Sequence, residues 1–412
     1  MPTILPRPGP PRVLAQAQLA NSIGDGAFYA TSALFFTQIV GLSATRVGVA
    51  LTVGWFTGML AGVPLGALAD RWGPRRTARV LAVCTSATLL AFLAIRSFPL
   101  FVLMFCLYAC CQAGLTSARQ TLLAGLVDAE ERTRVRAQLQ STLNGGLALG
   151  AGVGGVALSI DTEAAYLTVF AVDALMFLAA ALVLGRLPEV TAAAAPAAGE
   201  PRLTVLRDRR YALLTFLNAI LYLNMPLLSL GLPLWIAERT DAPKPMAAAV
   251  LVVNMLSVVV FQVRVARQVT DLSTASRTTA KAGVLLFTAC LVYAVTGSSL
   301  GALGAVCVLL AAALIQVFGE MMQGASAWEI GFGLAPDGKQ GQYQGFFGMA
   351  PQIARMLGPT VMTTLLIDWG TAGWLVLATL FLTAALSVHL VASRSTPAPQ
   401  PVTPLLESPT NH

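Results

Sequence analysis

The chain has 412 residues, of which 56% are hydrophobic and only 11% are charged. Soluble domains carry about 25% charged residues, so this composition excludes a protein whose main solvent is water. The net charge of +7 is dispersed between apolar runs and forms no dense patch, which argues against a nucleic-acid partner and for helices anchored at a membrane surface.

The apolar runs are long enough to cross a bilayer, because a spanning helix needs about 20 mostly apolar residues. Residues 1–13 are basic and Pro-rich without an apolar core, so we expect a cytoplasmic tail and no cleavable signal peptide. Hydropathy places six spans near 14–40, 47–69, 79–95, 99–126, 137–160 and 166–186. Six more follow near 211–236, 247–268, 282–297, 300–333, 343–367 and 373–392.

The stretch 187–210 between the two sets is rich in Ala, Pro and charged residues, which is typical of a linker. The sequence therefore predicts an all-α membrane protein of about twelve transmembrane helices in two six-helix bundles, 14–186 and 211–392, with a disordered tail at 393–412. Asn144 to Gly150 and Gln352 to Gly358 repeat one polar-to-glycine spacing, as expected if the halves are repeats.

The orientation follows from the excess of Lys and Arg in short cytoplasmic loops. With the N-terminus inside, the predicted inner loops hold Arg71, Arg75, Arg76, Arg79, Arg132, Arg134, Arg136, Arg202, Arg207, Arg209, Arg210, Arg264, Arg267, Arg277 and Lys281. The predicted outer loops hold only Arg46, Arg96, Arg239 and Lys244. We therefore expect a multi-pass protein of the inner (plasma) membrane with both termini in the cytoplasm.

The first predicted span contains a carboxyl group, Asp25, at a depth where a charge costs about 2.5–3.5 kcal/mol. Five polar residues lie three, four or seven positions from it and share its helix face: Gln18, Asn21, Ser22, Tyr29 and Ser32. This face is expected to line water, where Asp25 would bind and release a proton. The alternative is a hydrogen-bonded Asp that closes a contact between helices.

The most specific motif follows the second span and runs from Gly62-Val-Pro-Leu-Gly66 through Asp70-Arg71-Trp-Gly73-Pro to Arg75-Arg76. Its glycines allow close helix packing, Gly73 and Pro74 predict a tight turn, and Asp70 can face a helix N-terminus or an arginine. The alternative is a basic loop that only sets the topology.

This loop resembles the signature of the major facilitator superfamily, Gly-x-Leu-Ala-Asp-Arg-x-Gly-Arg-Arg, although Pro74 stands where that family often has Arg or Lys. The resemblance implies two rocking six-helix bundles and a cytoplasmic gate formed by Gly62, Gly66, Asp70, Arg71, Gly73, Arg75 and Arg76. It also implies that the first, fourth, seventh and tenth spans line a central cavity.

The fifth span is rich in glycine and resembles the antiporter signature of the superfamily's drug exporters at Gly146, Gly150, Gly154 and Gly155. Ala151 replaces the proline of that signature, and close helix packing alone would also select these glycines. Leu357-Gly358-Pro359 resembles the matching element of the other half. The proton-coupling arginine of those exporters is not carried over, and Arg119 is interpreted as an inner-surface or interhelix pairing residue.

Further polar residues fall in the spans that the resemblance places on the cavity. They are Gln112 in the fourth span, Asn218 and Tyr222 in the seventh, and Gln316, Glu320 and Gln323 in the tenth. Glu320 is expected to titrate or to attract a cationic solute, and the alternative is an ion pair with Arg355. Asp173 in the sixth span is expected to make a structural hydrogen bond, and Pro226 and Pro233 should kink the seventh span.

The sequence contains no phosphate-binding Gly-x-x-x-x-Gly-Lys-Ser/Thr loop, no apparatus of an enzyme and no metal or cofactor site. The hypothesis is a secondary transporter that exports a small amphipathic drug or natural product in exchange for protons, with the bilayer, the solute and protons as partners and a monomer as the working unit. The alternatives are a proton-coupled importer of a small nutrient and a non-transporting receptor or scaffold.

Overall fold

The computed structural model describes residues 6–190, 203–243 and 246–393, which are largely helical and contain no strand. The first half consists of α1 (Pro10–Leu34) with the π-helical turn η1 (Phe35–Ile39), α2 (Ala44–Trp72), α3 (Pro74–Ala94), α4 (Phe98–Leu126), α5 (Ala129–Ile160) and α6 (Glu163–Leu184). The predicted disorder of the tail and most of the predicted linker lie outside the described residues.

The second half begins with the short 3-10 helix η2 (Thr204–Arg207). Its helices are α7 (Arg209–Leu221), α8 (Asn224–Pro226), η3 (Leu227–Gly231), α9 (Leu232–Arg239), α10 (Met246–Ala266), α11 (Leu272–Val295), α12 (Gly301–Gly333), α13 (Gln340–Phe347), α14 (Met349–Met362), η4 (Thr363–Asp368) and α15 (Thr371–Ser393). If the segments 209–239 and 340–368 are each counted as one broken rod, the described part of the chain forms six rods in each half.

The break between α7 and α9 is the one that the prolines predict. Pro226 ends the short helix α8, a π-helical turn follows it, and Pro233 lies in the first turn of α9. A proline removes a backbone donor and clashes with the preceding turn, so this rod cannot continue as one regular helix. The predicted kink is confirmed.

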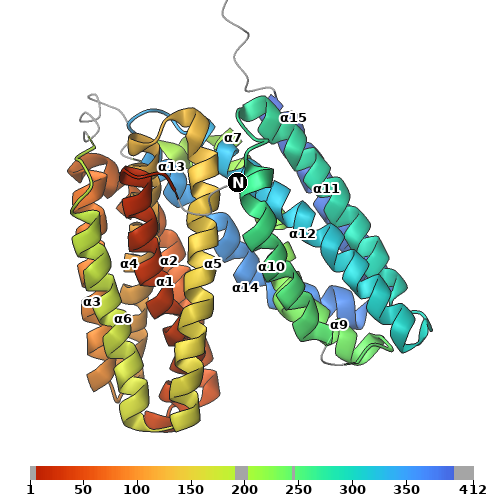
Figure 1. Cartoon of the computed structure of the whole chain (residues 1–412), viewed down its shortest axis with the longest axis horizontal. Coiled ribbons are helices and arrows are strands. Elements are labelled where there is room, and N and C mark those ends of the chain that lie inside the picture. The colour runs from red at the N-terminus through yellow and green to blue at the C-terminus, as the bar shows by residue number, and fades with distance from the viewer. Residues whose placement is uncertain (1–5, 191–202, 244–245, 394–412) are drawn as a thin grey trace, which may run out of the picture.

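Each half has an apolar core of its own. In the first half, aromatic rings of four helices pack together, with ring centroids of Phe36 and Phe101 only 4.0 Å apart and those of Phe35 and Phe170 at 4.8 Å. In the second half, Trp374 packs edge-on against Trp235, with centroids 5.5 Å apart. Figure 1 shows the two halves as separate groups of helices that approach each other at the end near α7 and α13 and diverge toward α9.

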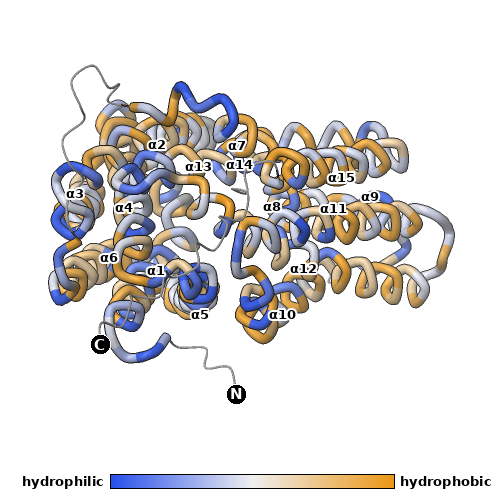
Figure 2. The backbone as a smooth tube through the Cα atoms, turned by 90° about the horizontal axis from the view of Figure 1, so that it is seen from above, coloured by the Kyte–Doolittle hydropathy of each residue, from blue (hydrophilic) through white to orange (hydrophobic). Residues whose placement is uncertain are grey.

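The surface of these groups suits lipid. Ten segments of the described chain are long and apolar enough to cross a membrane, by length and composition. Leu103, Leu182 and Leu303 are 59%, 70% and 78% exposed, which is unfavourable in water and favourable against hydrocarbon. In Figure 2 the hydrophobic colour follows most of the helices. The two remaining rods, 10–39 and 340–368, carry more polar residues, which contribute to the cavity and to the contact between the halves.

Two helices begin well before the predicted spans. The fifth span was expected from 137 and α5 begins at Ala129, while the ninth was expected from 282 and α11 begins at Leu272. Both extensions carry charged residues, which a hydropathy window excludes. A smaller difference is found at α1, which begins at Pro10 inside the predicted tail.

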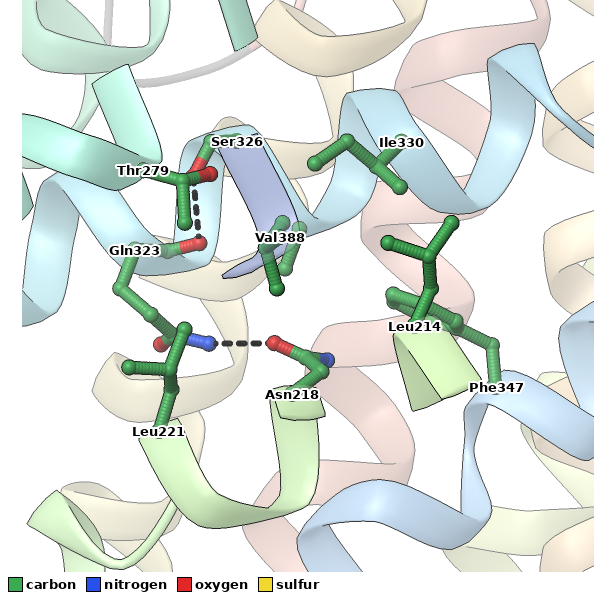
Figure 3. A pocket seen from close by; sticks show the side chains of 10 residues that line it. Leu214, Asn218, Leu221, Thr279, Gln323, Ser326, Ile330, Phe347 and Val388 are labelled. Carbon is green, nitrogen blue, oxygen red and sulfur yellow. Dashed lines mark hydrogen bonds between the residues drawn. The ribbon is translucent and has the colours of Figure 1, made fainter. Parts of the chain in front are cut away.

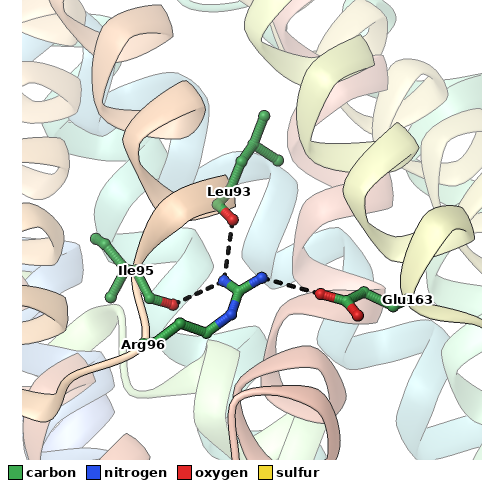
Figure 4. Close-up of polar contacts among 4 residues, drawn as sticks. All are labelled: Leu93, Ile95, Arg96 and Glu163. Atoms are coloured by element: carbon green, nitrogen blue, oxygen red, sulfur yellow. Dashed lines mark hydrogen bonds and ion pairs between the residues drawn. The ribbon is translucent and has the colours of Figure 1, made fainter.

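The turns between helices are fixed by polar contacts. Arg96 follows α3, where its guanidinium donates hydrogen bonds of 2.9 Å to the carbonyl oxygens of Leu93 and Ile95 (Figure 4). The same guanidinium pairs at 2.9 Å with Glu163, the first residue of α6. Carbonyls at a helix end have no partner within the helix, so this arginine supplies the missing donors and ties α3 to α6.

Candidate functional site

A cavity of about 920 Å³ lies between the two halves. Its wall is formed by α1, α2, α4 and α5 of the first half and by α10, α12, α13 and α14 of the second, with Tyr222, which follows α7, and residues of α8. Both carboxyl groups selected from the sequence, Asp25 and Glu320, belong to this wall. They come from opposite halves, so a solute in the cavity meets one acid from each.

Asp25 is held by two side chains of α4. Its Oδ1 accepts hydrogen bonds from the Tyr108 hydroxyl at 3.2 Å and from Gln112 Nε2 at 3.0 Å. Gln112 Nε2 also donates to the Tyr108 hydroxyl at 3.0 Å, and the two residues lie one helical turn apart. The tyrosine is fully buried, whereas Asp25 and Gln112 line the cavity. Asp25 therefore has fixed partners on one side and cavity space on the other.

Glu320 has a neutral partner from a neighbouring helix. Its Oε2 accepts a hydrogen bond of 2.8 Å from Nδ2 of Asn254, a buried residue of α10. Arg355, the alternative partner considered from the sequence, lines the same cavity from α14 and forms no ion pair with Glu320 within 4 Å. The carboxyl group and the guanidinium are thus both left facing the cavity.

The polar face of α1 is only partly turned toward the cavity. Gln18 and Tyr29 line it together with Asp25, but Asn21, Ser22 and Ser32 do not. Ser22 is fully buried against Gly146 of α5, and Asn21 is buried with both amide atoms lacking a hydrogen-bond partner. The expectation that this whole face lines water is wrong for Asn21, Ser22 and Ser32. At Ser22, α5 packs too closely over the helix to leave space.

The predicted residues of the seventh and tenth spans divide in the same way. Tyr222 and Gln323 line the cavity, whereas Asn218 and Gln316 do not. Asn218 accepts a hydrogen bond of 2.8 Å from Gln323 Nε2 beside a small separate pocket (Figure 3). Gln316 is buried and accepts a hydrogen bond of 2.9 Å from the Tyr293 hydroxyl. The face shared by the three residues of α12 is therefore split between the cavity and the core.

Arg119 pairs with a neighbouring helix, which is one of its two interpretations from the sequence. It lines the cavity from α4, and its Nη1 donates a hydrogen bond of 3.1 Å to Oε1 of Gln18 on α1. The pairing between helices is present, but the residue faces the space between the halves.

Asp173 also departs from its expectation. It is fully buried in α6 against Gly24 of α1, and neither carboxyl oxygen has a hydrogen-bond partner among the described residues. The expected structural hydrogen bond is absent there.

The loop after α2 joins the halves at the end of the molecule that we call the closed end, defined by the Gly73 turn and the first turn of α13. Gly73 has φ +88°, a conformation that favours glycine, and Pro74 starts α3. The Asp70 carboxylate is buried and accepts hydrogen bonds from the backbone N–H groups of Gly341 at 2.6 Å and Gln342 at 3.0 Å. Asp70 thus faces a helix N-terminus, one of the two arrangements that the motif allows.

Two pairs of glycines bring the backbones of α2 and α13 together beside Asp70. A methyl group at Gly66 would overlap the carbonyl of Gly341, and one at Gly345 would overlap the carbonyl of Gly62. Each helix therefore contributes two glycines four residues apart, the spacing that lets helices touch closely. The contact crosses from the first half to the second.

The basic residues of the motif lie outside this contact. Arg75 donates to the Leu187 carbonyl at 2.6 Å and pairs with Glu189 within the first half. Arg71 and Arg76 are exposed. A second contact joins the halves at the closed end, where the Thr133 hydroxyl of α5 donates to the Glu329 carboxylate of α12.

Comparison with known proteins decides the family. The sequence model of the Major Facilitator Superfamily matches residues 14–359, which is most of the chain. The chain belongs to the major facilitator superfamily. A search of curated proteins gives no match.

Solved structures support the same fold. A bacterial homologue of the iron transporter ferroportin, outward-facing with soaked iron, has a TM-score of 0.71 and 16% identity, and 93% of this chain and 98% of that one are covered. FucP, the E. coli fucose:proton symporter, in its outward conformation, has a TM-score of 0.68 and 16% identity, with 94% and 99% covered. The human organic anion transporter MFSD10 (TETRAN) has 0.66 and 16%, with 92% and 99% covered. At these identities the likeness concerns the fold alone.

The glycines that resemble the superfamily's antiporter signature form a packing face between α5 and α1. A methyl group at Gly146, Gly150 or Gly154 would overlap atoms of Ser22, Ile23 or Ala27. Gly155 has open space around it and takes no part in this face. In the other half, Gly358 of α14 packs against Pro226 of α8, so the two repeated segments occupy matching places.

Sequence reasoning missed four residues of this superfamily member's site. Tyr108 and Asn254 hold the two carboxyl groups, and Gly341 and Gly345 form the second half of the glycine contact. The spacing of Gly341 and Gly345 matches that of Gly62 and Gly66, a signal that was available in the sequence. Tyr108 lies four residues before Gln112, but an aromatic residue in a span is more often a packing residue.

Proposed function

We propose that this superfamily member exports a small amphipathic compound in exchange for protons, as a monomer in the inner (plasma) membrane. Membership of the family makes it a multi-pass membrane transporter. The observation that carries the proposal is the presence of Asp25 and Glu320, from opposite halves, on one cavity wall. Each acid has a neutral hydrogen-bonding partner, so neither is committed to an ion pair within its half.

The proposed cycle uses the contact between the halves as a gate. In the described conformation the halves are joined at the closed end by Asp70 and the paired glycines, while their ribbons diverge at the other end. If the basic loops are cytoplasmic, as the distribution of arginines predicts, the cavity serves the outer face in this state. Protonation of Asp25 or Glu320 would follow there, and rocking of the halves would then expose the cavity to the cytoplasm.

The composition of the cavity wall supports an amphipathic solute. Apolar surface comes from Trp55, Phe56 and Met59 of α2 and from Met349 and Met356 of α14. Many amide side chains lie among them: Gln18, Gln112, Gln120, Gln140, Asn144, Asn224, Gln262, Gln323, Gln344 and Gln352. A binding site of this kind buries an apolar body and orients it through a few polar contacts.

A second candidate is cotransport of the solute with protons, that is, import. The observation that favours it is the presence of arginines on the same wall, Arg119, Arg136 and Arg355. A solute that carries negative charge to them would repel ionised carboxylates, so solute and proton would bind together. A receptor or scaffold with this fold would bind a solute without moving it.

The test starts from a susceptibility screen of cells with and without the gene, which selects a compound for flux measurements. In energised everted vesicles an antiporter accumulates that compound and releases protons from the lumen, whereas a proton symporter does not accumulate it. We expect Asp25→Asn with Glu320→Gln to abolish both protection and proton-linked flux. Asp337→Asn, an exposed acid outside the cavity, is the matched control and should change neither.

Unaltered resistance and flux in the double variant would remove both acids from the mechanism. Binding of the compound without flux in the unmodified protein would instead favour the receptor reading.

A further inference from the structure

Three arginines line the central cavity, and they come from both halves. Arg119 and Arg136 extend from α4 and α5, and Arg355 extends from α14. The ion pairs found in the described chain involve other arginines, namely Arg7, Arg75, Arg96 and Arg134. None of the three cavity arginines has a carboxylate within 4 Å among the described residues.

The hydrogen-bonding and ring partners of Arg119 and Arg136 are neutral. Arg119 donates to the Gln18 amide oxygen at 3.1 Å. Arg136 lies over the Trp328 ring, 5.3 Å from its centroid, and donates to Gln120 at 3.1 and 3.2 Å when that amide oxygen faces it. A guanidinium has five N–H donors, so these contacts leave donors on both residues unused.

Arg355 and Arg136 line the same cavity from opposite halves. The side chain of Tyr222 lies on the same wall. Arg355 itself is exposed to the cavity, and its position on α14 places it opposite the two arginines of the first half.

The charges on the wall do not balance. Three arginines face two carboxyl groups, so the wall carries a net charge of +1 with both acids ionised and of +3 with both protonated. Charged groups at membrane depth normally pair with an opposite charge, because an unpaired one is costly to keep there. The missing negative charge is therefore one that a solute can supply.

We infer that the transported solute is a small organic anion, whose acid group binds between Arg355 and the arginines of the first half. The chemistry is that of a carboxylate, sulfonate or phosphate, which the planar guanidinium fork matches with two parallel hydrogen bonds. The apolar body of the solute would pack against Trp55, Met59 and Met356. This inference rests on the part of the proposed function that both candidates share, transport of a solute through this cavity, and names the substrate class; by the charge argument given above, an anionic solute favours cotransport with protons over exchange.

The inference also gives binding a mechanical role. An anion held by Arg355 on one side and by Arg136 on the other joins the two halves through the solute. Such a solute binds better when the halves are close around the cavity, so it favours the occluded arrangement over the open one. A neutral solute of the same shape lacks this preference.

The experiment measures binding to the purified full-length protein without a proton gradient. The probes are three naphthalene acids (2-naphthoate, naphthalene-2-sulfonate and 2-naphthyl phosphate), the neutral 2-naphthamide and the cationic 2-naphthylmethylammonium. We expect at least one acid to bind about tenfold more tightly than the amide and the cation. Arg355→Gln and Arg136→Gln should each weaken acid binding about tenfold, which corresponds to about 1.4 kcal/mol.

Two controls separate a lost charge from a lost fold. Arg355→Lys keeps the charge and should retain part of the acid binding, and Arg277→Gln, an exposed arginine at the start of α11, should retain all of it. Thermal unfolding without probes checks that each variant is folded. Equal binding of acids and amide, binding of no acid, or acid binding that survives both glutamine substitutions would overturn the inference.

The outcomes distinguish this inference from the proposed function. If acid binding depends on the arginines but solute flux does not depend on a proton gradient, proton coupling is overturned and the inference of an anion site stands. If a neutral or cationic compound shows proton-linked flux and no acid binds, the inference of an anion site is overturned and proton coupling stands.

Discussion

Two carboxyl groups of the first half lie on packed helices and differ in their surroundings. Asp25 accepts hydrogen bonds from Tyr108 and Gln112 and borders the cavity. Asp173 is fully buried against the backbone of Gly24, the residue next to Asp25, and its oxygens accept no hydrogen bond from the described residues. Burying a charge without partners is costly, so the two acids are not equivalent as carriers of a proton.

Replacement of Asp173 by asparagine should therefore be tolerated. Asp173→Asn keeps the shape of the side chain and removes no hydrogen bond seen among the described residues, so we expect a loss of stability below about 1 kcal/mol. Transport should stay within about twofold of the unmodified protein. The measurements are thermal unfolding in detergent and the vesicle flux assay, with Asp25→Asn in parallel. Loss of flux with Asp173→Asn equal to that with Asp25→Asn would show that the buried acid takes part in coupling.

The sequence identified the polar residues that lie within the membrane spans. It did not show which of them face the cavity and which face the core. Asp25 and Glu320 could be selected because a carboxyl group in a membrane span is costly and is therefore usually functional. Ser22 and Gln316 could not be sorted from them, since a helix face is wide and the neighbour that covers one edge of it is set by tertiary packing. Tyr108 was missed because its aromatic ring gives no polar signal in a span.

At the scale of helices, glycine position decides how closely α1 and α5 pack. Gly150 touches the backbone of Ile23, whereas Gly155, five residues later and on another face of the helix, has open space around it. The two glycines belong to the same helix and to the same sequence motif, so they form a matched pair.

The pair predicts opposite effects of the same substitution. Gly150→Ala places a methyl group into the α1 backbone and should destabilise the protein by about 1–3 kcal/mol, as overpacking does. Gly155→Ala meets no atom and should be neutral or stabilising by up to about 1 kcal/mol, because alanine favours a helix more than glycine does. Thermal unfolding of the two variants checks this. Equal effects would mean that the close α1–α5 packing is absent in the membrane-extracted protein.

Helix boundaries show where hydropathy fails as a guide. The start of α11 is fixed by Asp271, which accepts a hydrogen bond of 2.8 Å from the Thr274 N–H while Thr274 bonds back to it. This N–H group also holds the pKa of the Asp271 carboxyl below its usual range. A capping box of Asp and Thr departs from the usual Ser/Thr and Glu/Gln pattern, so the sequence did not reveal it. The predicted apolar span began ten residues later.

At the scale of the whole molecule, the arrangement of two six-helix halves was predictable and the contact between them only in part. The apolar spans and the loop motif fix the family, whose model matches residues 14–359. Asp70 was expected to face a helix N-terminus or an arginine, and it faces the first turn of α13. The sequence did not show which helix packs against α2 beside Asp70, because this contact depends on glycines about 275 residues further along the chain.

This contact should set the balance between the two ends of the transporter. Asp70→Ala leaves the buried N–H groups of Gly341 and Gln342 without an acceptor and removes two hydrogen bonds to a charged group, each worth about 1.5–3 kcal/mol. A change of that size moves a two-state equilibrium by about tenfold or more. We therefore expect Asp70→Ala to open the closed end and bring the far ends of the halves together.

Spin labels across the halves measure this directly, in a background without the six native cysteines. Labels at Arg76 and Arg277, exposed near the closed end, should move apart in Asp70→Ala, while labels at Ser159 and Ser299, exposed near the far end, should move closer. Asp271→Ala is the control, because it removes a helix cap inside one half and should change neither distance. If Asp70→Ala lengthens the first distance and leaves the second unchanged, the contact is a local clasp, and the halves do not rock as rigid bodies about the cavity.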